Sequence, residues 1–433
     1  MIREEQDTRV FYGVYITLLM FYVLFFTGGG GFYSFQVFIP RLEEEFGWTR
    51  FQTVLPGALW AVAFGGSGFF VGSWIQRFGV RRVLAVGLLG GASHAVLMSM
   101  ITDLWHLFVL SMVAGVILAA TTMVPAQTAI TLWFNKKRGR AMGLVMMGTG
   151  IGGLVAPPLT AWLIQQVGWR GTNRITALVI LVLVLPPVLL FLKDKPADIG
   201  EVPDGRKTAA IGEATHVPIG IPADRAVRKT AFWLLFFINF LHVFVTSSIM
   251  VNSVAFAEGV GYPRLVAPLF PAIAVGFSVP FRFLCGFLAD RIGPRILILS
   301  GGAFLGGSAL ALHGLVITLG LRDQTPIWVF GILYGFGSAT SFVALPILVG
   351  RCFGDLEFGK ILGLLMIGFA GGAGFGGPSA ARIFDATGSY AWSFILAAIA
   401  AALSVALTLL VRPQALYREF VTARERPSPT NKG

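Results

Sequence analysis

Residues 281–295 read FRFLCGFLADRIGPR, and this stretch decides the fold. It places one arginine, Arg282, inside an otherwise apolar span, which then ends in a turn at Gly293 and Pro294. A charged side chain near the middle of a membrane helix costs about 2.5 to 3.5 kcal/mol on insertion scales. Such a residue faces the bundle interior or a wet cavity, and arginine cannot lose its proton to escape the cost. Its planar guanidinium matches a carboxylate, so Arg282 is the candidate for binding an organic anion.

The composition indicates a membrane protein. The chain has 433 residues, of which 55% are hydrophobic and only 12% charged, and its mean hydropathy is +0.77. Soluble proteins carry about twice that charged fraction. The net charge of +12 would suit nucleic acid, but most Lys and Arg lie in short loops between apolar spans. This is the positive-inside pattern, which argues for a lipid bilayer and against a nucleic-acid partner.

We predict an all-α polytopic membrane protein with twelve transmembrane helices in two six-helix, pseudo-symmetric bundles. A long polar gap divides the chain into an N-terminal bundle (1–192), a cytoplasmic linker (193–230), a C-terminal bundle (231–412) and a cytoplasmic tail (413–433). The expected spans are about 11–36, 51–75, 82–101, 105–133, 139–167, 172–192, 231–257, 265–290, 295–319, 325–352, 359–385 and 390–411.

Basic residues predict the orientation. With both termini in the cytoplasm, 25 of the 33 Lys and Arg lie in cytoplasmic segments, 7 lie outside, and Arg282 lies within a span. The asymmetry favours this topology because the side rich in Lys and Arg stays inside. We therefore expect a multi-pass protein of the inner cell membrane.

The two halves repeat each other. Residues 72–81 (GSWIQRFGVR) match residues 286–295 (GFLADRIGPR), and each stretch follows the second span of its half. A second set of positions also recurs: Gly139, Gly143, Gly148, Gly152, Pro158 and Gly168 correspond to Gly359, Gly363, Gly368, Gly372, Pro378 and Gly388. Matching halves of six spans indicate two parallel repeats around a central path.

These motifs resemble those of the major facilitator superfamily over nearly the whole chain. The loop pattern G-x-L-A-D-R-x-G-x-R is complete in the second copy, whereas the first has Gln76 where the acid would be. Within the superfamily the sequence is most similar to the monocarboxylate porter family and its bacterial oxalate/formate exchanger relatives. The likeness rests on GGGGFY at 28–33, EEEFGW at 43–48, KRGRAMG at 137–143, GWRG at 168–171, and Arg282 four residues before Gly286.

The resemblance implies that the signature loop latches the two halves at the cytoplasmic side. Asp290 would lie near the N-terminal end of the fifth span, where a carboxylate meets the positive helix end and a nearby arginine. The expected latch residues are Asp290, Arg291, Gly286, Arg140, Gln76 and Arg77.

The resemblance also places the substrate at Arg282. Ser278 stands one turn before it, where eukaryotic monocarboxylate porters have Asp, so the arginine lacks an obvious local counter-ion. We expect Tyr334 and Asn252 as substrate neighbours, and Tyr33 occupies the position of an outer lysine in those porters. The other polar groups at membrane depth are expected to bond between helices: Gln127, Asn239, His94, His242 and His313.

The favoured function is secondary active transport of a small organic anion, foremost a monocarboxylate, by alternating access, with protons as candidate co-substrates. The alternatives are a dicarboxylate or formate-type exchanger, an exporter of apolar drugs, or, least favoured, a membrane sensor that transports nothing. An exchanger of doubly charged anions would be expected to hold a second buried cation, and a drug exporter would not need Arg282. No enzymatic motif or metal-ligand spacing is present, so we expect a monomeric transporter without cofactor or metal.

Overall fold

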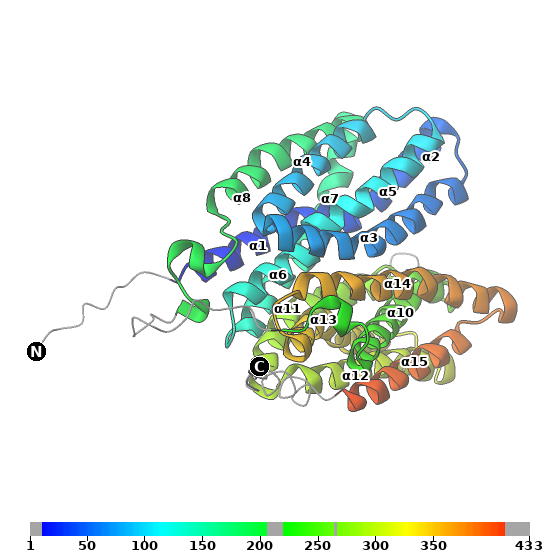
Figure 1. The fold of residues 1–433 in the computed structure, drawn as a ribbon. Coiled ribbons are helices and arrows are strands. Elements are labelled where there is room, and N and C mark those ends of the chain that lie inside the picture. The colour runs from blue at the N-terminus through cyan, green and yellow to red at the C-terminus, as the bar shows by residue number, and fades with distance from the viewer. Residues whose placement is uncertain (1–10, 206–219, 264–265, 412–433) are drawn as a thin grey trace, which may run out of the picture.

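The computed structural model of the chain describes residues 11–205, 220–263 and 266–411, with only the backbone described at 32, 33, 50, 51, 54 and 205. Within these ranges every regular element is helical, apart from an isolated bridge between Gly220 and Gly354. Figure 1 shows two helical bundles side by side, one formed by α1 to α8 and the other by α10 to α15. The predicted all-α fold with two bundles is therefore confirmed.

The N-terminal bundle contains the first six crossings. Its elements are α1 (Tyr12–Gly28), η1 (Gly29–Tyr33), α2 (Phe35–Phe46), α3 (Arg50–Phe78), α4 (Val80–Met98), α5 (Leu104–Thr121), α6 (Met123–Trp133), α7 (Arg138–Val179), η2 (Ile180–Val184) and α8 (Leu185–Phe191). Two short 3-10 turns in the linker, η3 (Pro196–Ile199) and η4 (Pro203–Gly205), follow this bundle.

The C-terminal bundle contains the other six. Its elements are α9 (Ala223–Ala226), α10 (Thr230–Gly259), α11 (Leu269–Ile292), α12 (Pro294–Ala311), η5 (Leu312–Thr318), α13 (Thr325–Phe353), α14 (Phe358–Thr387) and α15 (Ala391–Leu410). The short helix α9 belongs to the linker and precedes the first crossing of this half.

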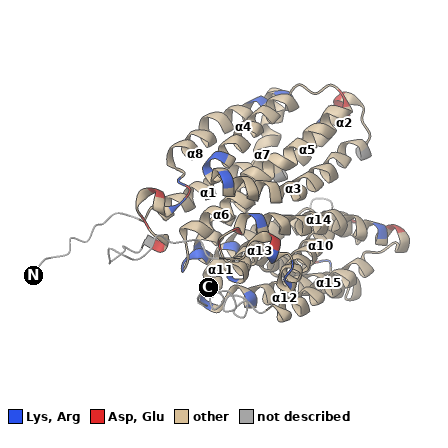
Figure 2. Ribbon diagram, viewed as in Figure 1, with Lys and Arg blue, Asp and Glu red and all other residues tan. Residues whose placement is uncertain are grey.

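Eleven helical segments of the described chain are long and apolar enough to span a bilayer. One of them, Arg138–Phe191, is 54 residues long, which is twice the length of one crossing. The helix breaks at Gly168, whose φ of 72° and ψ of 169° lie outside the helical region. The fifth and sixth spans therefore run on from each other through this kink, and the described residues form twelve crossings. Figure 2 shows charged residues mainly toward helix ends, with long uncharged stretches between them.

The signature loops adopt the same backbone in both repeats. Gly79 and Gly293 have φ of 85° and 91°, a region that costs glycine little and other residues much. Each glycine ends one crossing and starts the next within a single residue. These two turns lie at the same end of the molecule as the linker, and we call it the linker end.

Glycine rows bring the helices of each half together. A Cβ on Gly148 or Gly152 of α7 would collide with backbone carbonyls of α1. A Cβ on Gly372 or Gly376 of α14 would collide in the same way with α10. The G-x-G-x-x-G run at 148–153 therefore serves close helix packing, as small residues do in membrane bundles.

The two halves meet mainly through two helix pairs, α7 with α11 and α3 with α14. Both pairs approach through glycine. Added Cβ atoms on Gly139 and Gly286 would each collide with the other residue's carbonyl, and one on Gly68 would lie 2.7 Å from the carbonyl oxygen of Gly363. All four glycines lie in the parts of these helices nearer the linker end.

The apolar cores also join the two halves at the linker end and not at the opposite end. The largest cluster of buried apolar residues draws on both halves and includes Met142 of α7 and Cys285 of α11. Toward the opposite end the clusters separate: one includes Phe256 and Phe394 of the C-terminal half, and another includes Leu42 and Trp169 of the N-terminal half. The structure is therefore a state in which the halves are closed together at the linker end.

We predict that Gly72→Ala destabilises this closed state. Gly72 packs on the backbone of Gly359, and a Cβ there would collide with that carbonyl oxygen. Overpacking of this kind costs about 1–3 kcal/mol, so the variant should unfold at lower temperature in detergent than the wild-type protein.

Gly66→Ala on the same helix is the matched control. Nothing lies within 4 Å of a Cβ added at Gly66, so this exposed substitution should leave thermal stability equal or slightly higher. Equal unfolding temperatures for the two variants would contradict the packing argument.

Candidate functional site

Arg282 lies in the middle of α11 and is buried, with 3% of its surface exposed. Its Nη1 atom donates hydrogen bonds to two groups of α7, the carbonyl oxygen of Met146 at 2.9 Å and the hydroxyl of Thr149. Its guanidinium carbon lies 4.6 Å from the centre of the Phe342 ring of α13. The arginine of the C-terminal half is thus anchored on the N-terminal half by neutral groups, with an aromatic face against its charge.

A cavity of about 80 Å³ lies between the two halves, and Arg282 is not among the residues that line it. Phe342 is shared, because it lines the cavity and also packs on the guanidinium. The lining comes from α6, α10, α13 and α14: Met123, Gln127, Asn239, His242, Val243, Thr246, Ser338, Ser341, Phe342, Leu345, Pro346, Leu362, Met366 and Phe369. The wall therefore combines apolar and aromatic surface with a few polar groups, which is the usual character of a small-molecule site.

Three further residues that we expected beside the substrate, Tyr334, Asn252 and Ser278, also lie outside the cavity wall. The hydroxyl of Tyr334 donates to the carbonyl of Thr246, so the ring lies one layer behind a lining residue. The Asn252 amide donates to carbonyls of Ser248 and Gly377. The hydroxyl of Ser278 donates to a carbonyl of its own helix, and the side chain of Tyr33 lies outside the described residues.

The polar groups that do line the cavity are ones for which the sequence predicted interhelical hydrogen bonds. Asn239 donates to the carbonyl of Leu365 on α14 at 2.9 Å, and Nδ1 of His242 lies 2.6 Å from the hydroxyl of Ser341 on α13. Gln127 Nε2 lies 3.5 Å from the carbonyl oxygen of Phe342. These bonds do join helices. The same three side chains also line the cavity, which their spacing in the sequence did not indicate.

Asp290 joins the two halves at the linker end. Its carboxylate accepts hydrogen bonds from the backbone N–H groups of Gly139 and Arg140, at 2.8 and 3.0 Å, at the start of α7. The side chain of Arg140 lies 3.8 Å from the same carboxylate and packs over the Phe287 ring. A carboxylate on helix-start amides is held by charge-assisted bonds and by the helix dipole.

Two other expected latch residues lie near this contact. Gly286 packs directly on Gly139, and Arg291 lies over the Phe287 ring. Arg77, in the first copy of the loop, packs over the adjacent Phe78.

The first copy of the loop makes the equivalent contact with the roles exchanged. Gln76 donates to the carboxylate of Glu357, which directly precedes α14. The same carboxylate accepts from Lys360 at 2.8 Å and from the backbone N–H of Ala223 in the linker helix α9. Thus one loop supplies the acid and the other supplies the amide, and the sequence comparison of the two copies did not indicate the partner of Gln76.

The first part of the linker is tied to the N-terminal bundle through its acids. Asp204 accepts hydrogen bonds from backbone N–H groups of the segment 135–137, just before α7. Asp194 accepts from the N–H of Arg81 in the first turn of α4, and Glu201 from the N–H of Tyr12 at the start of α1. The described part of the linker therefore docks on helix starts.

Two of the sequence motifs meet at the opposite end of the N-terminal bundle. Glu45, at the end of α2, accepts hydrogen bonds from the indole N–H of Trp169 and from the guanidinium of Arg170. Arg170 also packs over the rings of Phe46 and Trp169. The EEEFGW and GWRG motifs are thus two sides of one contact that holds α2 against α7.

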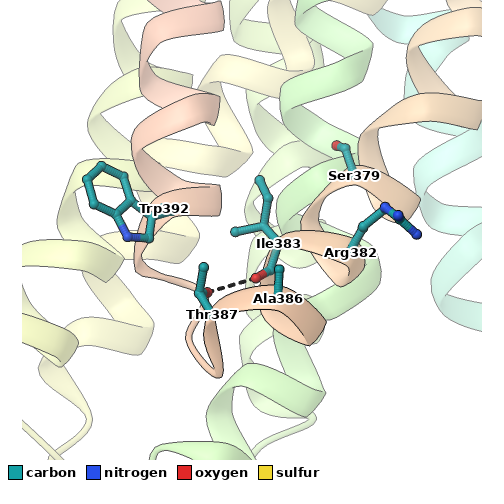
Figure 3. Close-up of a pocket in the computed structure, with 6 residues that line it drawn as sticks. All are labelled: Ser379, Arg382, Ile383, Ala386, Thr387 and Trp392. Carbon is teal, nitrogen blue, oxygen red and sulfur yellow. Dashed lines mark hydrogen bonds between the residues drawn. The ribbon is translucent and has the colours of Figure 1, made fainter.

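A further hollow opens on the surface of the C-terminal bundle, between the last turns of α14 and the start of α15 (Figure 3). It is lined by Ser379, Arg382, Ile383, Ala386, Thr387 and Trp392. The Arg382 side chain points away from Trp392 in Figure 3, and the Trp392 ring is 61% exposed. An exposed tryptophan at a helix start is typical of the membrane interface, so this hollow fits lipid contact.

Comparison with known proteins identifies the family of the chain. Residues 21–321 match the model of the Major Facilitator Superfamily. The chain is 28% identical over 298 residues to MFS-type transporter 1 of Ophiocordyceps sp., a match that covers 69% of this chain and 62% of that relative, less than two thirds of its length. It is 27% identical to monocarboxylate transporter 13 of Rattus norvegicus, over 74% of this chain and 71% of that relative.

Solved structures show the same architecture. The transporter FucP in the outward conformation superposes with a TM-score of 0.68 at 14% identity, over 92% of this chain and 99% of FucP. The proton:xylose symporter XylE superposes with a TM-score of 0.71 at 14% identity, over 92% of this chain and 95% of XylE. At such identity the likeness concerns the fold alone. The match of residues 21–321 to the family model shows that this chain belongs to the major facilitator superfamily.

Proposed function

We propose that this transporter carries a small monocarboxylate across the membrane by alternating access of its two halves. The observation that carries the proposal is the position of Arg282: a buried, permanently charged guanidinium at the contact between the halves, beside a cavity lined by both. A charged side chain at that depth is costly to insert into the membrane and therefore marks a candidate functional site. The similarity to proteins named monocarboxylate transporters supports the same substrate class.

The chemistry of binding is an exchange of partners. In this state Nη1 of Arg282 is bonded to a neutral carbonyl and a neutral hydroxyl of α7. A carboxylate is a stronger acceptor for a guanidinium than either group, because both partners are charged. A substrate that takes over these bonds would also remove a link between α7 and α11, so that binding and movement of the halves become coupled.

The cavity favours a small, singly charged substrate. Its volume of about 80 Å³ is far below the roughly 300–1,000 Å³ of sites for drug-sized ligands. Among the residues that line it, none is Lys or Arg; the cation that we assign to the substrate is Arg282, which packs on the wall residue Phe342. A doubly charged anion would lack a second partner, and a large apolar drug would lack space.

Under this proposal the linker end faces the cytoplasm, as the distribution of Lys and Arg favours. Because the halves are closed at that end, the state described here corresponds to one that faces outward. Both chain ends would then lie in the cytoplasm, and the protein would reside in the cell membrane. Protons would accompany the anion, either on the substrate or on the titratable residue of the cavity wall, His242.

We predict that Arg282→Ala abolishes uptake of radiolabelled monocarboxylates into proteoliposomes while the protein remains folded. Arg282→Lys should retain part of the binding, because the charge stays and the planar fork is lost. A charge-assisted bond of this kind contributes about 1.5–3 kcal/mol, or about a tenfold to hundredfold change in affinity. Uptake is measured with and without a pH gradient, together with thermal stability of the same purified variants.

Thr149→Val is the matched control, since it removes one neutral partner and leaves the guanidinium in place. Uptake should persist in this variant. A stable Arg282→Ala protein that carries monocarboxylates at the wild-type rate would refute the proposed function.

We predict that Asp290→Asn loosens the closed linker end. The asparagine keeps one acceptor oxygen but turns an N–H₂ toward an amide N–H, so one of the two bonds to Gly139 and Arg140 is lost. Two native thiols report the opening, because Cys285 and Cys352 are both buried in this state. Their alkylation by a maleimide should become several times faster.

The exposed Asp385, on the part of α14 far from the linker end, provides a control of the same chemistry. Asp385→Asn should leave the alkylation rate unchanged. Equal rates for both variants would mean that the Asp290 contact does not hold the halves together.

We predict a pH dependence of the second contact, at Glu357. Burial tends to raise the pKa of this carboxyl, but hydrogen bonds from Ala223, Lys360 and Gln76 outweigh it and lower the pKa below its ordinary value of 4.5. A lowered pKa in the folded state means that the stabilisation is complete above the ordinary value and is lost as pH falls through the lowered one.

The difference in thermal stability between wild type and Glu357→Gln should therefore be constant from neutral pH down to about 5 and shrink below about 4. The comparison cancels the titration of the other carboxyl groups. A difference that changes already between pH 8 and 6 would contradict the assignment.

A further inference from the structure

Two arginines, one from each half, pack on the same phenylalanine ring at the linker end. Arg291, in the last turn of α11, has its guanidinium carbon 4.1 Å from the centre of the Phe287 ring. Arg140, in the first turn of α7, has its guanidinium carbon 5.0 Å from the same centre. The two charges are therefore at most about 9 Å apart. Like charges at this spacing repel each other, and an anion between them relieves the repulsion.

The acid beside this arginine pair is already engaged elsewhere. Both carboxylate oxygens of Asp290 accept hydrogen bonds from the backbone N–H groups of Gly139 and Arg140. The Arg140 guanidinium reaches this carboxylate only through Nε, at 3.8 Å, and the side chain is 48% exposed. Arg291 is exposed, and among the described residues no acid pairs with its guanidinium. The pair therefore presents charged donors at the surface of the molecule.

The ring belongs to a face of α11 that is turned outward. Phe283, Phe287 and Arg291 are spaced by four residues, so they lie on one face of the helix. Phe283 is 47% exposed, and Ile292, next to the arginine, is 46% exposed. Because the halves are closed together at this end, these apolar side chains contact lipid and not the central cavity. The face runs from apolar at membrane depth to cationic at the linker end, which matches a lipid with an anionic head.

The neighbouring charges favour an anionic head over a zwitterionic one. Lys136 and Lys137, just before α7, are exposed as well. An ammonium group on the lipid head would meet these further cations, whereas a head with only a phosphate charge would meet donors alone. A phosphate diester has two unesterified oxygens, and the planar fork of arginine suits each of them. One phosphate can thus accept from both guanidiniums.

We propose that an anionic phospholipid binds at this point, with its phosphate between Arg140 and Arg291 and an acyl chain along Phe283. The site joins α7 of the N-terminal half to α11 of the C-terminal half. The bound lipid therefore links the halves at the linker end and stabilises the closed state, in addition to the Asp290 contact. The site is separate from the central cavity and independent of the transported substrate.

The test measures how fast N-ethylmaleimide alkylates Cys285 and Cys352 in nanodiscs of phosphatidylcholine, with and without phosphatidylglycerol of the same acyl chains. Both thiols are buried in the closed state, so a lipid that holds the halves together slows their alkylation. The reagent is uncharged, and its local concentration does not depend on the charge of the lipid. For the wild-type protein we expect phosphatidylglycerol to lower the rate about fivefold, as one basic residue near an anionic head supplies.

Three variants locate the effect. Arg291→Gln removes one guanidinium of the pair and should bring the ratio of the two rates to near one. Arg140→Gln should do the same, and because each variant is compared with itself in two lipids, a change in its basal rate cancels. Arg82→Gln is the matched control, since Arg82 is an exposed arginine in the first turn of α4, at the same end of the molecule. This variant should keep the wild-type ratio.

Two further additions identify the ligand. Phosphatidylethanolamine carries the phosphate together with an ammonium group, and soluble glycerol phosphate lacks acyl chains; neither should slow the alkylation. An effect of either one equal to that of phosphatidylglycerol would overturn the anionic-lipid site. So would a wild-type rate that phosphatidylglycerol leaves unchanged, or a lipid effect that persists in both variants of the pair. Equal loss of the effect in Arg82→Gln would show a general response to surface charge and would also overturn the site.

Discussion

The guanidinium of Arg282 lies in the middle of an apolar bundle, where its charge cannot be removed by loss of a proton. It must therefore find partners, and its own half of the protein supplies only the ring of Phe342 among the contacts described above. The hydrogen bonds come from α7 of the other half. Arg282 therefore belongs both to the contact between the halves and to the central site. A change in the partners of its guanidinium affects both.

Both sides of the closed interface at the linker end are held by a second kind of constraint, the unpaired N–H groups at helix starts. Asp290 satisfies two of them on α7, and Glu357 satisfies one on the linker helix while it accepts from Gln76. The pseudo-symmetry of the repeats is therefore kept in the geometry and not in the residue types. A contact needs one acceptor and one donor, and either half can supply either.

The sequence predicted the fold well because the bilayer imposes span length, and turns at glycine and proline separate the spans. It predicted twelve crossings but not that the fifth and sixth would run on through a kink at Gly168. The sequence also indicated Arg282 as the candidate anion-binding residue, because a charge in an apolar span is visible without a structure. It could not rank the neutral polar groups, because a helix that is apolar on all sides carries no periodic signal of the face turned to a cavity. For that reason Gln127 and His242 were not predicted as substrate neighbours, whereas Tyr334 and Asn252 were, although neither of these two lines the cavity.

The nature of the closed interface bears on how such a protein can move. Glycine pairs such as Gly139 with Gly286 bring the backbones of the halves together, and the largest cluster of buried apolar residues draws on both halves. Directional contacts at Asp290, Glu357 and Arg282, each worth about 1–3 kcal/mol, add to this packing. Two of these three lie at the linker end, and the third lies beside the wall residue Phe342. A ligand that replaces the contact at Arg282 therefore changes the free energy that closes the interface, which is the condition for a binding event to shift a two-state equilibrium.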